Sequence, residues 1–322
     1  TEAVFLGTGD DVATVTGANT VNLGTGNNSL TAYSVKSISA SSSVFTDSVV
    51  LADTQPGNVA ISYVENITGS AGLDTVALAH TGTNTQPVTI TGVERLLPVA
   101  SSRIPFASLN PSMLIYLDST GAAATLVLPN PAAETLRITG SYNAGTGALI
   151  AGQASPTAHF QGGAEDTLMI EKDNISTGST ISGFGAIVAS GTGSVSQSLN
   201  FASSSAGFAG SVTMGAGIGD SFTFTSGNDT ATITGAEAVN FAGGSDTITV
   251  TGANTIGLSS GTNTAIVMSS ATVNAGTGAD TIRIGAPGIT LSVASSFAVG
   301  TDRIDATLLA ASYAAFDAGS TK

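Results

Sequence analysis

Residues 244–266 read GSDTITVTGANTIGLSSGTNTAI, and residues 9–31 read GDDVATVTGANTVNLGTGNNSLT. The two stretches align without a gap at a constant offset of 235 residues (244 − 9). A shorter repeat lies inside each stretch, because acidic or amide residues recur every 17 positions. These residues are Asp11 and Asn28, and then Asp229, Asp246, Asn263 and Asp280. Self-similarity at a fixed period is typical of repeat architectures, so the period is the first guide to the fold.

One 17-residue period predicts two short strands and two turns. In residues 246–250 apolar and polar side chains alternate, which places Ile248 and Val250 on one face, and residues 254–258 repeat the alternation. Seventeen residues are too few for a propeller blade but fit one coil of a parallel β-roll or β-solenoid, with coils stacked about 4.8 Å apart. The inward positions expected to form the core are Val21 with Ile38, Leu23 with Ala40, Val239 with Ile256 and Val273, and Phe241 with Leu258 and Ala275.

The middle of the chain departs from this period. Six of the nine prolines lie between positions 98 and 156, where a proline inside a stacked strand would remove a ladder hydrogen bond. Two antiparallel hairpins are expected there, pairing 113–117 with 125–128 and 135–139 with 148–150. The expected fold class is all-β, with parallel β-roll or β-solenoid segments of 17-residue coils at both ends. Three parts are expected: a degenerate β-roll over 1–97, a proline-containing β insertion over 98–210, and a second β-roll with a closing segment over 211–322. The insertion is either a sandwich-like antiparallel domain or an irregular widening of the solenoid, and the single expected helix covers 306–316.

Composition narrows the class of partner. The chain has 22 acidic and 8 basic residues, a formal charge of −14, and a pI near 4.1. Eight basic residues are too few for a phosphate-neutralising surface, so a nucleic-acid partner is not expected. The absence of cysteine excludes disulfides and thiolate metal sites. No apolar run approaches the length of a membrane helix, so no transmembrane segment is expected. The missing initiator methionine suggests a processed chain or a piece of a longer one.

Enzymatic chemistry is not expected from these residues. The two histidines, His80 and His159, are 79 positions apart, and serine and aspartate are too abundant for a triad pattern to be informative. The close carboxylates Asp10 and Asp11 alternate across a strand and have no aromatic platform beside them. We therefore predict no catalytic residues and no organic cofactor.

Several turns follow a glycine–aspartate pattern. Residues 275–283 (AGTGADTIR) match G-G-x-G-x-D-x-U-x with one substitution, as do residues 69–77 (GSAGLDTVA), and partial matches begin near Leu6, Ala242 and Ser226. The pattern resembles the calcium-binding repeat of RTX (repeats-in-toxin) proteins. Residues 297–305 (FAVGTDRID) resemble the segment that closes many RTX domains. The phrases ITGVE at 90–94 and ITGAE at 233–237 resemble segments of secreted bacterial S-layer proteins. The resemblance covers about half of the chain.

This resemblance implies bound Ca²⁺. The residues carried over as metal-site positions are Gly7, Gly9, Asp11, Gly72, Asp74, Gly227, Asp229, Gly244, Asp246, Gly276, Gly278 and Asp280. Glycine permits the positive φ that turns backbone carbonyls inward, and aspartates of neighbouring coils add the hard oxygen ligands that Ca²⁺ prefers. Two carboxylates about 5 Å apart repel by roughly 1 kcal/mol in water and about 3 kcal/mol at an effective dielectric of 20, which a cation would reverse.

The alternative is that these aspartates only form Asx turns, in which the side chain bonds the backbone two residues on. Asn28 and Asn263 stand in equivalent places and favour this alternative, since asparagine brings no charge. RTX rolls carry calcium turns on both sides of each coil, whereas the opposite turn here reads Thr-Gly-Ala, as at 16–18 and 251–253. At most one row of calcium sites is therefore expected.

The favoured function is a secreted bacterial cell-surface structural protein that self-assembles into an S-layer-like lattice or a fibre and is stabilised by calcium. The RTX resemblance implies an extracellular location and export by a type I system. The main expected partner is the protein itself, as a homopolymer or lattice, and a cell-surface polysaccharide is a second expected partner. The alternative is a surface adhesin or carbohydrate-binding module, which an exposed aromatic cluster near Tyr116 and Tyr142 would favour. A polysaccharide-acting β-helix enzyme is the least favoured function.

Overall fold

The computed structural model describes residues 2–41, 45–53, 58–80, 86–110, 112–128, 133–146, 148–151, 153–171, 173–190, 196–215, 218–294 and 296–310. The fold is all-β, with parallel sheets forming a β-solenoid of about 14 turns, which confirms the expected class. Within the described residues the one helix is α1 (Thr307–Ala310); the rest of the helix expected over 306–316 lies outside the described part. The chain divides into an N-terminal unit, Thr1–Ile175, and a C-terminal unit, Ser176–Lys322.

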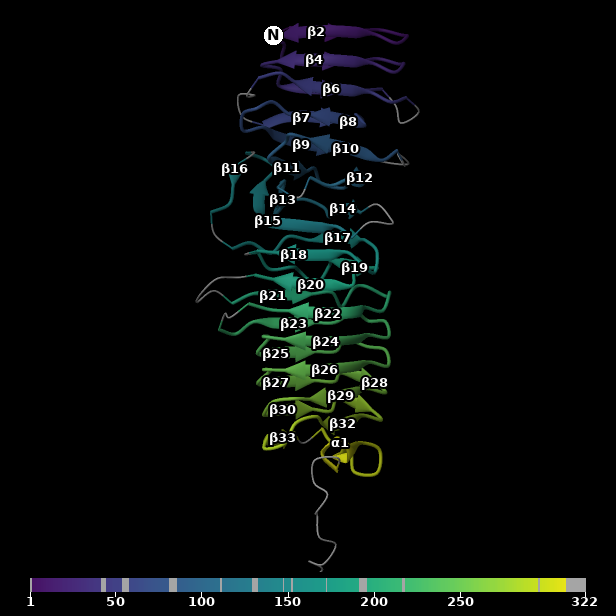
Figure 1. Ribbon diagram of the computed structural model, residues 1–322, viewed down its shortest axis with the longest axis vertical. Helices are drawn as coiled ribbons and strands as arrows, with labels where there is room; N and C mark the ends of the chain where they lie inside the picture. The colour runs from purple at the N-terminus through teal and green to yellow at the C-terminus, as the bar shows by residue number, and fades with distance from the viewer. Residues whose placement is uncertain are drawn as a thin grey trace, which may run out of the picture. The chain divides into compact units, whose positions relative to one another are not determined.

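The N-terminal unit consists of two parallel sheets, to which each coil contributes one strand per sheet (Figure 1). The first sheet contains β1 (Ala3–Phe5), β3 (Thr20–Asn22), β5 (Ser37–Ser39), β7 (Asn58–Ser62), β9 (Thr75–Ala79), β11 (Arg95–Pro98), β13 (Leu114–Asp118), β15 (Thr135–Asn143) and β18 (Thr167–Ile170). The second sheet contains β2 (Val12–Thr16), β4 (Ser29–Tyr33), β6 (Ser48–Leu51), β8 (Asn66–Thr68), β10 (Val88–Thr91), β12 (Arg103–Ser108), β14 (Ala124–Val127) and β17 (Ala158–Gln161).

The middle of the chain continues these two sheets with longer coils. Equivalent residues are 17 apart at Asp11 and Asn28 but 32 apart at Glu134 and Asp166. The predicted hairpin between 113–117 and 125–128 is wrong, because β13 pairs in parallel with β11 and β15 while β14 pairs in parallel with β12 and β17. Alternating apolar residues fit an antiparallel hairpin and a parallel stack equally well. Here β13 and β14 bury their apolar faces as members of two different sheets.

The second predicted hairpin is correct only at its tip. The end of β15 pairs antiparallel with β16 (Ala148–Leu149), through Tyr142 and Asn143. Residues 135–138 instead pair in parallel with β18, so they belong to the stack of coils. Up to residue 175, the middle segment is thus a widening of the solenoid that carries one short antiparallel ribbon.

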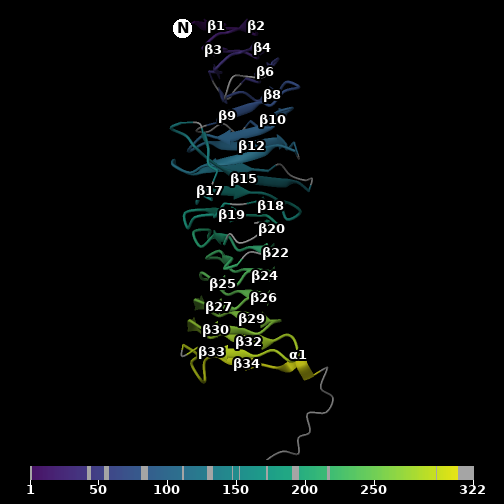
Figure 2. The same cartoon turned by 90° about the vertical axis from the view of Figure 1, so that its left-hand side faces the viewer.

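The C-terminal unit also has two parallel sheets, which Figure 2 shows on opposite sides of the coils. One contains β20 (Ala186–Ala189), β22 (Ala209–Thr213), β24 (Thr230–Thr234), β26 (Thr247–Thr251), β29 (Thr264–Val267), β32 (Thr281–Ile284) and β34 (Arg303–Asp305). The other contains β21 (Ser198–Asn200), β23 (Ser221–Thr223), β25 (Ala238–Asn240), β27 (Thr255–Gly257), β30 (Ala271–Asn274) and β33 (Leu291–Val293). The remaining strands are β19 (Thr180–Ser182) and a two-stranded ribbon of β28 (Ser260–Gly261) and β31 (Thr277–Gly278).

The core is a thin layer of side chains between the two sheets of each unit. Ile248 and Val250 are fully buried, and every inward position predicted from the 17-residue period is buried. In the C-terminal unit the apolar layer begins with phenylalanines: Phe222 and Phe224 have ring centroids 4.8 Å apart, and Phe224 lies 6.0 Å from Phe241. Because the coils are stacked, side chains at equivalent positions of neighbouring coils lie in contact. The 17-residue period therefore also determines which core side chains pack together. No helix among the described residues is long and apolar enough to cross a membrane.

Candidate metal site: rows of buried carboxylates

The predicted aspartates of the C-terminal unit fall into one row. Asp229, Asp246 and Asp280 each stand directly before a strand of the same parallel sheet, at β24, β26 and β32. Parallel strands begin at the same edge, so these side chains lie one above another. Asn263 before β29 and Asp302 before β34 complete the set, which is called the C-terminal row from here on.

One side-chain oxygen of each of Asp246, Asn263, Asp280 and Asp302 accepts a backbone N–H from the preceding coil. The backbone N–H of Asp229 donates to Oδ1 of Asp246 at 2.8 Å, and that of Asp246 donates to Oδ1 of Asn263 at 3.1 Å. The N–H of Asn263 donates to Asp280 at 3.0 Å, and that of Asp280 donates to Asp302 at 3.0 Å. The side chains in this row therefore bridge adjacent coils. The Asx-turn alternative would instead place the hydrogen bond within one coil, to the backbone two residues further on.

The second carboxyl oxygen of each predicted aspartate has no such partner. Oδ2 of Asp11, Asp229, Asp246 and Asp280 and Oδ1 of Asp74 are buried and make no hydrogen bond. Burial raises the pKa of Asp229 to about 6 and that of Asp246 to about 6, where the charge of Asp229 adds to the effect. Burial also raises the pKa of Asp280. A buried anionic oxygen without a donor is costly, so these positions favour a proton or a cation.

The asparagines show what surrounds that second oxygen. Nδ2 of Asn263 donates to the carbonyl oxygen of Leu258 at 2.8 Å and to Oδ1 of Asp280 at 3.0 Å. In the N-terminal unit, Nδ2 of Asn28 donates to the Gly26 carbonyl at 3.0 Å and to Oδ1 of Asp47 at 2.9 Å. The amide nitrogen thus occupies a place lined by oxygen acceptors.

The two predicted aspartates of the N-terminal unit do not share a row. Asp11 precedes β2 and belongs with Asn28, Asp47 and Glu65, whose side chains accept the backbone N–H groups of Asp11, Asn28 and Asp47 in turn. Asp74 precedes β9 in the other sheet, and its N–H donates to Oε2 of Glu94 at 2.8 Å. The constant 17-residue spacing ends after Asn28, so the sequence did not separate these two rows.

Most of the predicted glycines adopt the conformation that was expected of them. Gly7, Gly9, Gly244, Gly276 and Gly278 all have φ between +75° and +135°. Gly227 is crowded instead, since a side chain there would meet the backbone of residues 205–207. Gly72 donates its N–H to Oγ of Ser70, whose hydroxyl and N–H bond Asp74.

A second acidic row in the C-terminal unit was missed. Asp220 and Glu237 precede β23 and β25 at the opposite edge of the coil, so carboxylates lie on both sides of these coils, while the expectation of at most one row of calcium sites stays a prediction. The N–H of Gln197 donates to Asp220 at 2.7 Å, and the N–H of Asp220 donates to Oε2 of Glu237 at 2.7 Å. The signal was present in the repeated phrase ITGxE, whose glutamates Glu94 and Glu237 have the same role in the two units.

The fit of these rows to a metal ion is partial. Within the described ranges, no group of three or more His, Cys, Asp or Glu side chains is placed to hold an ion. The C-terminal row offers pairs instead, each made of an aspartate with an orphaned carboxyl oxygen and the side chain of the next coil, whose oxygen accepts that aspartate's backbone N–H. Backbone carbonyls would have to supply the other ligands, which Ca²⁺ accepts because it binds six to eight oxygens in flexible geometry.

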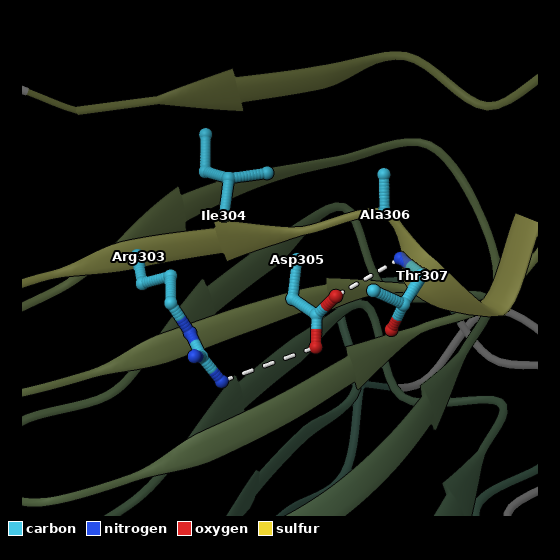
Figure 3. Close-up of a pocket in the computed structure, with 5 residues that line it drawn as sticks. All are labelled: Arg303, Ile304, Asp305, Ala306 and Thr307. Atoms are coloured by element: carbon cyan, nitrogen blue, oxygen red, sulfur yellow. Dashed lines mark hydrogen bonds and ion pairs between the residues drawn. The ribbon is translucent and has the colours of Figure 1, made fainter. Parts of the chain in front are cut away.

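A surface pocket at the last coil offers different chemistry. Its lining is the segment 303–307, drawn in Figure 3. The carboxylate of Asp305 accepts the N–H of Thr307 at 2.9 Å and faces Arg303 at 4.0 Å and Arg283 at 3.3 Å. These hydrogen bonds and then the arginines lower the pKa of Asp305. The pocket therefore holds an already paired carboxylate that anchors α1.

The two histidines lie in the N-terminal unit but differ in burial. His80 follows β9 and is fully buried, with its ring centroid 6.1 Å from that of Tyr63, while His159 is half-buried on β17. Burial lowers the pKa of His80 to about 4.

His80 makes the N-terminal unit sensitive to acid. Its folded pKa lies below the unfolded value of 6.5, so its contribution is complete above pH 6.5 and is lost as the pH falls toward 4. Between pH 6.5 and 4 the wild-type protein loses free energy of unfolding through His80. We expect His80→Gln to make this loss smaller by about 2 kcal/mol, after allowance for solvent screening. The measurement is urea unfolding followed by tyrosine fluorescence, since four of the five tyrosines lie in this unit. Identical pH profiles for the two proteins would contradict the expectation.

The chain matches no family model, no curated protein and no solved structure. The resemblance to RTX and S-layer proteins therefore rests on the quoted motifs, and membership of that class stays a prediction.

Proposed function

We propose that this chain is a secreted structural protein of the bacterial cell surface, held together by calcium and assembled with copies of itself into an S-layer-like lattice or a fibre. The observation that carries the proposal is the set of five buried carboxyl oxygens without partners, one on each aspartate that the glycine–aspartate motif selects. The motif and the orphaned oxygens coincide at these five aspartates, while Asp118 and Glu134, outside the motif, also have a buried carboxyl oxygen that makes no hydrogen bond.

Calcium has a definite role in this proposal. In the C-terminal row, Asp229 and Asp246 are adjacent and buried, so their mutual repulsion opposes stacking of the two coils. A bound Ca²⁺ would reverse the sign of this interaction. A chain exported from a compartment with little free calcium would then complete its coils outside the cell, with a gain that grows as free Ca²⁺ exceeds Kd.

The outer faces of the coils suit repeated contacts between copies. On the sheet of β24 and β26, Thr230, Thr232 and Thr234 align in register with Thr247, Thr249 and Thr251. These two coils present the same polar, uncharged surface, so a contact made at one of them is available at the other; at the position of Thr249 the next two coils carry Ile266 and Arg283. The adhesin alternative lacks its expected support, because Tyr116 and Tyr142 are buried against Leu97 and form no exposed platform.

The test is negative-stain microscopy with size-exclusion chromatography of the whole chain, in millimolar Ca²⁺ and in EGTA. We expect ordered sheets or filaments in calcium that dissociate in EGTA, with Mg²⁺ failing to replace Ca²⁺ because it demands near-octahedral geometry. A folded monomer that is indifferent to calcium would contradict the proposal. A screen for hydrolysis of common polysaccharides is a cheap companion, since turnover would favour the enzyme alternative.

A further inference from the structure

We propose that Asn263 and Asn28 take the place of a bound cation with their side-chain amides, so that an asparagine position in a row is closed to metal and an aspartate position requires one. The inference rests on the proposed calcium binding and specifies where the ions go. It predicts the number of ions from the residues of the row, which the motif alone does not.

The first step is the contact set of the asparagine. Nδ2 of Asn263 lies 2.8 Å from the Leu258 carbonyl oxygen and 3.0 Å from Oδ1 of Asp280, and Asn263 is fully buried. Asn28 is buried in the same way and also donates to a carbonyl of its own turn and to the side chain of the next coil. In both cases the amide donates to two oxygens, one of which, on the side chain of the next coil, also accepts the asparagine's backbone N–H.

The second step is the comparison with aspartate at the same position. Asp246 is one 17-residue period before Asn263, in parallel register, and its Oδ1 accepts the equivalent backbone N–H. Its Oδ2 stands where asparagine has Nδ2, because the two side chains are isosteric. The equivalent acceptors are the Phe241 carbonyl and Oδ1 of Asn263. An oxygen acceptor facing oxygen acceptors is the environment that a hard cation satisfies.

The third step is the count. Asp229, Asp246 and Asp280 each combine a buried orphan oxygen with a side-chain oxygen of the next coil, on Asp246, Asn263 and Asp302 respectively. Asn263 separates the Asp246 position from the Asp280 position, so the C-terminal row has three positions for an ion, two before Asn263 and one after it. At least nine-tenths of each of these three aspartates is buried, so an ion held there is shielded from solvent.

The experiment exchanges aspartate and asparagine and counts ions. Isothermal titration with Ca²⁺ would compare the wild-type chain with Asp246→Asn, Asn263→Asp and a control, Asn240→Asp, whose side chain is exposed on β25. We expect one ion fewer for Asp246→Asn, one more for Asn263→Asp, and no change for the control. In EGTA we expect Asp246→Asn to melt at least about 3 °C above wild type and Asn263→Asp to melt below it.

The outcomes separate this inference from the proposed function. Calcium binding by the wild type with a count that ignores the two exchanges would overturn the inference alone. Correct counts without any ordered assembly would overturn the lattice and leave the inference standing. A wild type that binds no calcium would overturn both.

Discussion

Gly261→Ala is expected to destabilise the C-terminal unit by about 3 kcal/mol or more. Gly261 has φ +115°, which costs an alanine roughly 1–2 kcal/mol by itself. A Cβ there would also overlap the Gly244 carbonyl oxygen of the preceding coil. Two stacked coils cannot separate locally without breaking ladder hydrogen bonds, so the clash adds to the backbone strain. Urea unfolding of the whole chain measures the loss.

The matched control is Gly252→Ala in the same unit. Gly252 has φ +90°, close to that of Gly261, but the nearest atom to its Cβ would be the Gly235 nitrogen at 3.7 Å, an ordinary contact. We expect this variant to lose only the backbone term, about 1–2 kcal/mol. Equal losses for the two variants would show that close approach of coils is not what selects glycine at 261.

The fold could be predicted wherever the period is constant. Seventeen-residue spacing at 229–280 places the same side chain inward in each coil, so Ile256 and Val273 could be assigned to the core from the sequence alone. Between 95 and 171 the coils lengthen, and equivalent residues such as Glu134 and Asp166 are 32 apart. Alternation then still marks strands but no longer identifies their neighbours, which is why β13 and β14 were taken for a hairpin.

The candidate site was predicted in part for the same reason. The glycine–aspartate pattern selected Asp11, Asp74, Asp229, Asp246 and Asp280, and each has an orphaned oxygen. The pattern could not find Asp47 or Glu65, because no glycine stands in the six residues before either of them, and the 17-residue period could not find them because the coils there have 19 and 18 residues. It also missed Glu237, whose longer side chain reaches the same backbone N–H position from a turn without the motif. Whether a residue belongs to one of these rows depends on how neighbouring coils are aligned, and a linear motif does not contain that information.

Truncation of a ring in the aromatic layer is expected to destabilise the C-terminal unit strongly. Phe224 is fully buried. The centroid of its ring lies 4.8 Å from that of Phe222, 6.0 Å from that of Phe241 and 6.4 Å from that of Phe208. Phe224→Ala removes one ring from this packed aromatic layer and leaves a cavity among the remaining rings. We expect a loss of about 3–5 kcal/mol, measured by urea unfolding of the whole chain.

Two further variants make that expectation specific to packing. The inward series continues every 17 residues from Phe224 through Phe241 and Leu258 to Ala275, all buried, so the fold accepts leucine at an equivalent position. We therefore expect Phe224→Leu to lose less than half as much as Phe224→Ala. Ile218→Ala, at a side chain that is 77% exposed, should change stability by less than about 0.5 kcal/mol. If Phe224→Ala were no worse than Ile218→Ala, the aromatic layer would not hold these coils together, and the inter-coil side-chain rows would have to supply the stability.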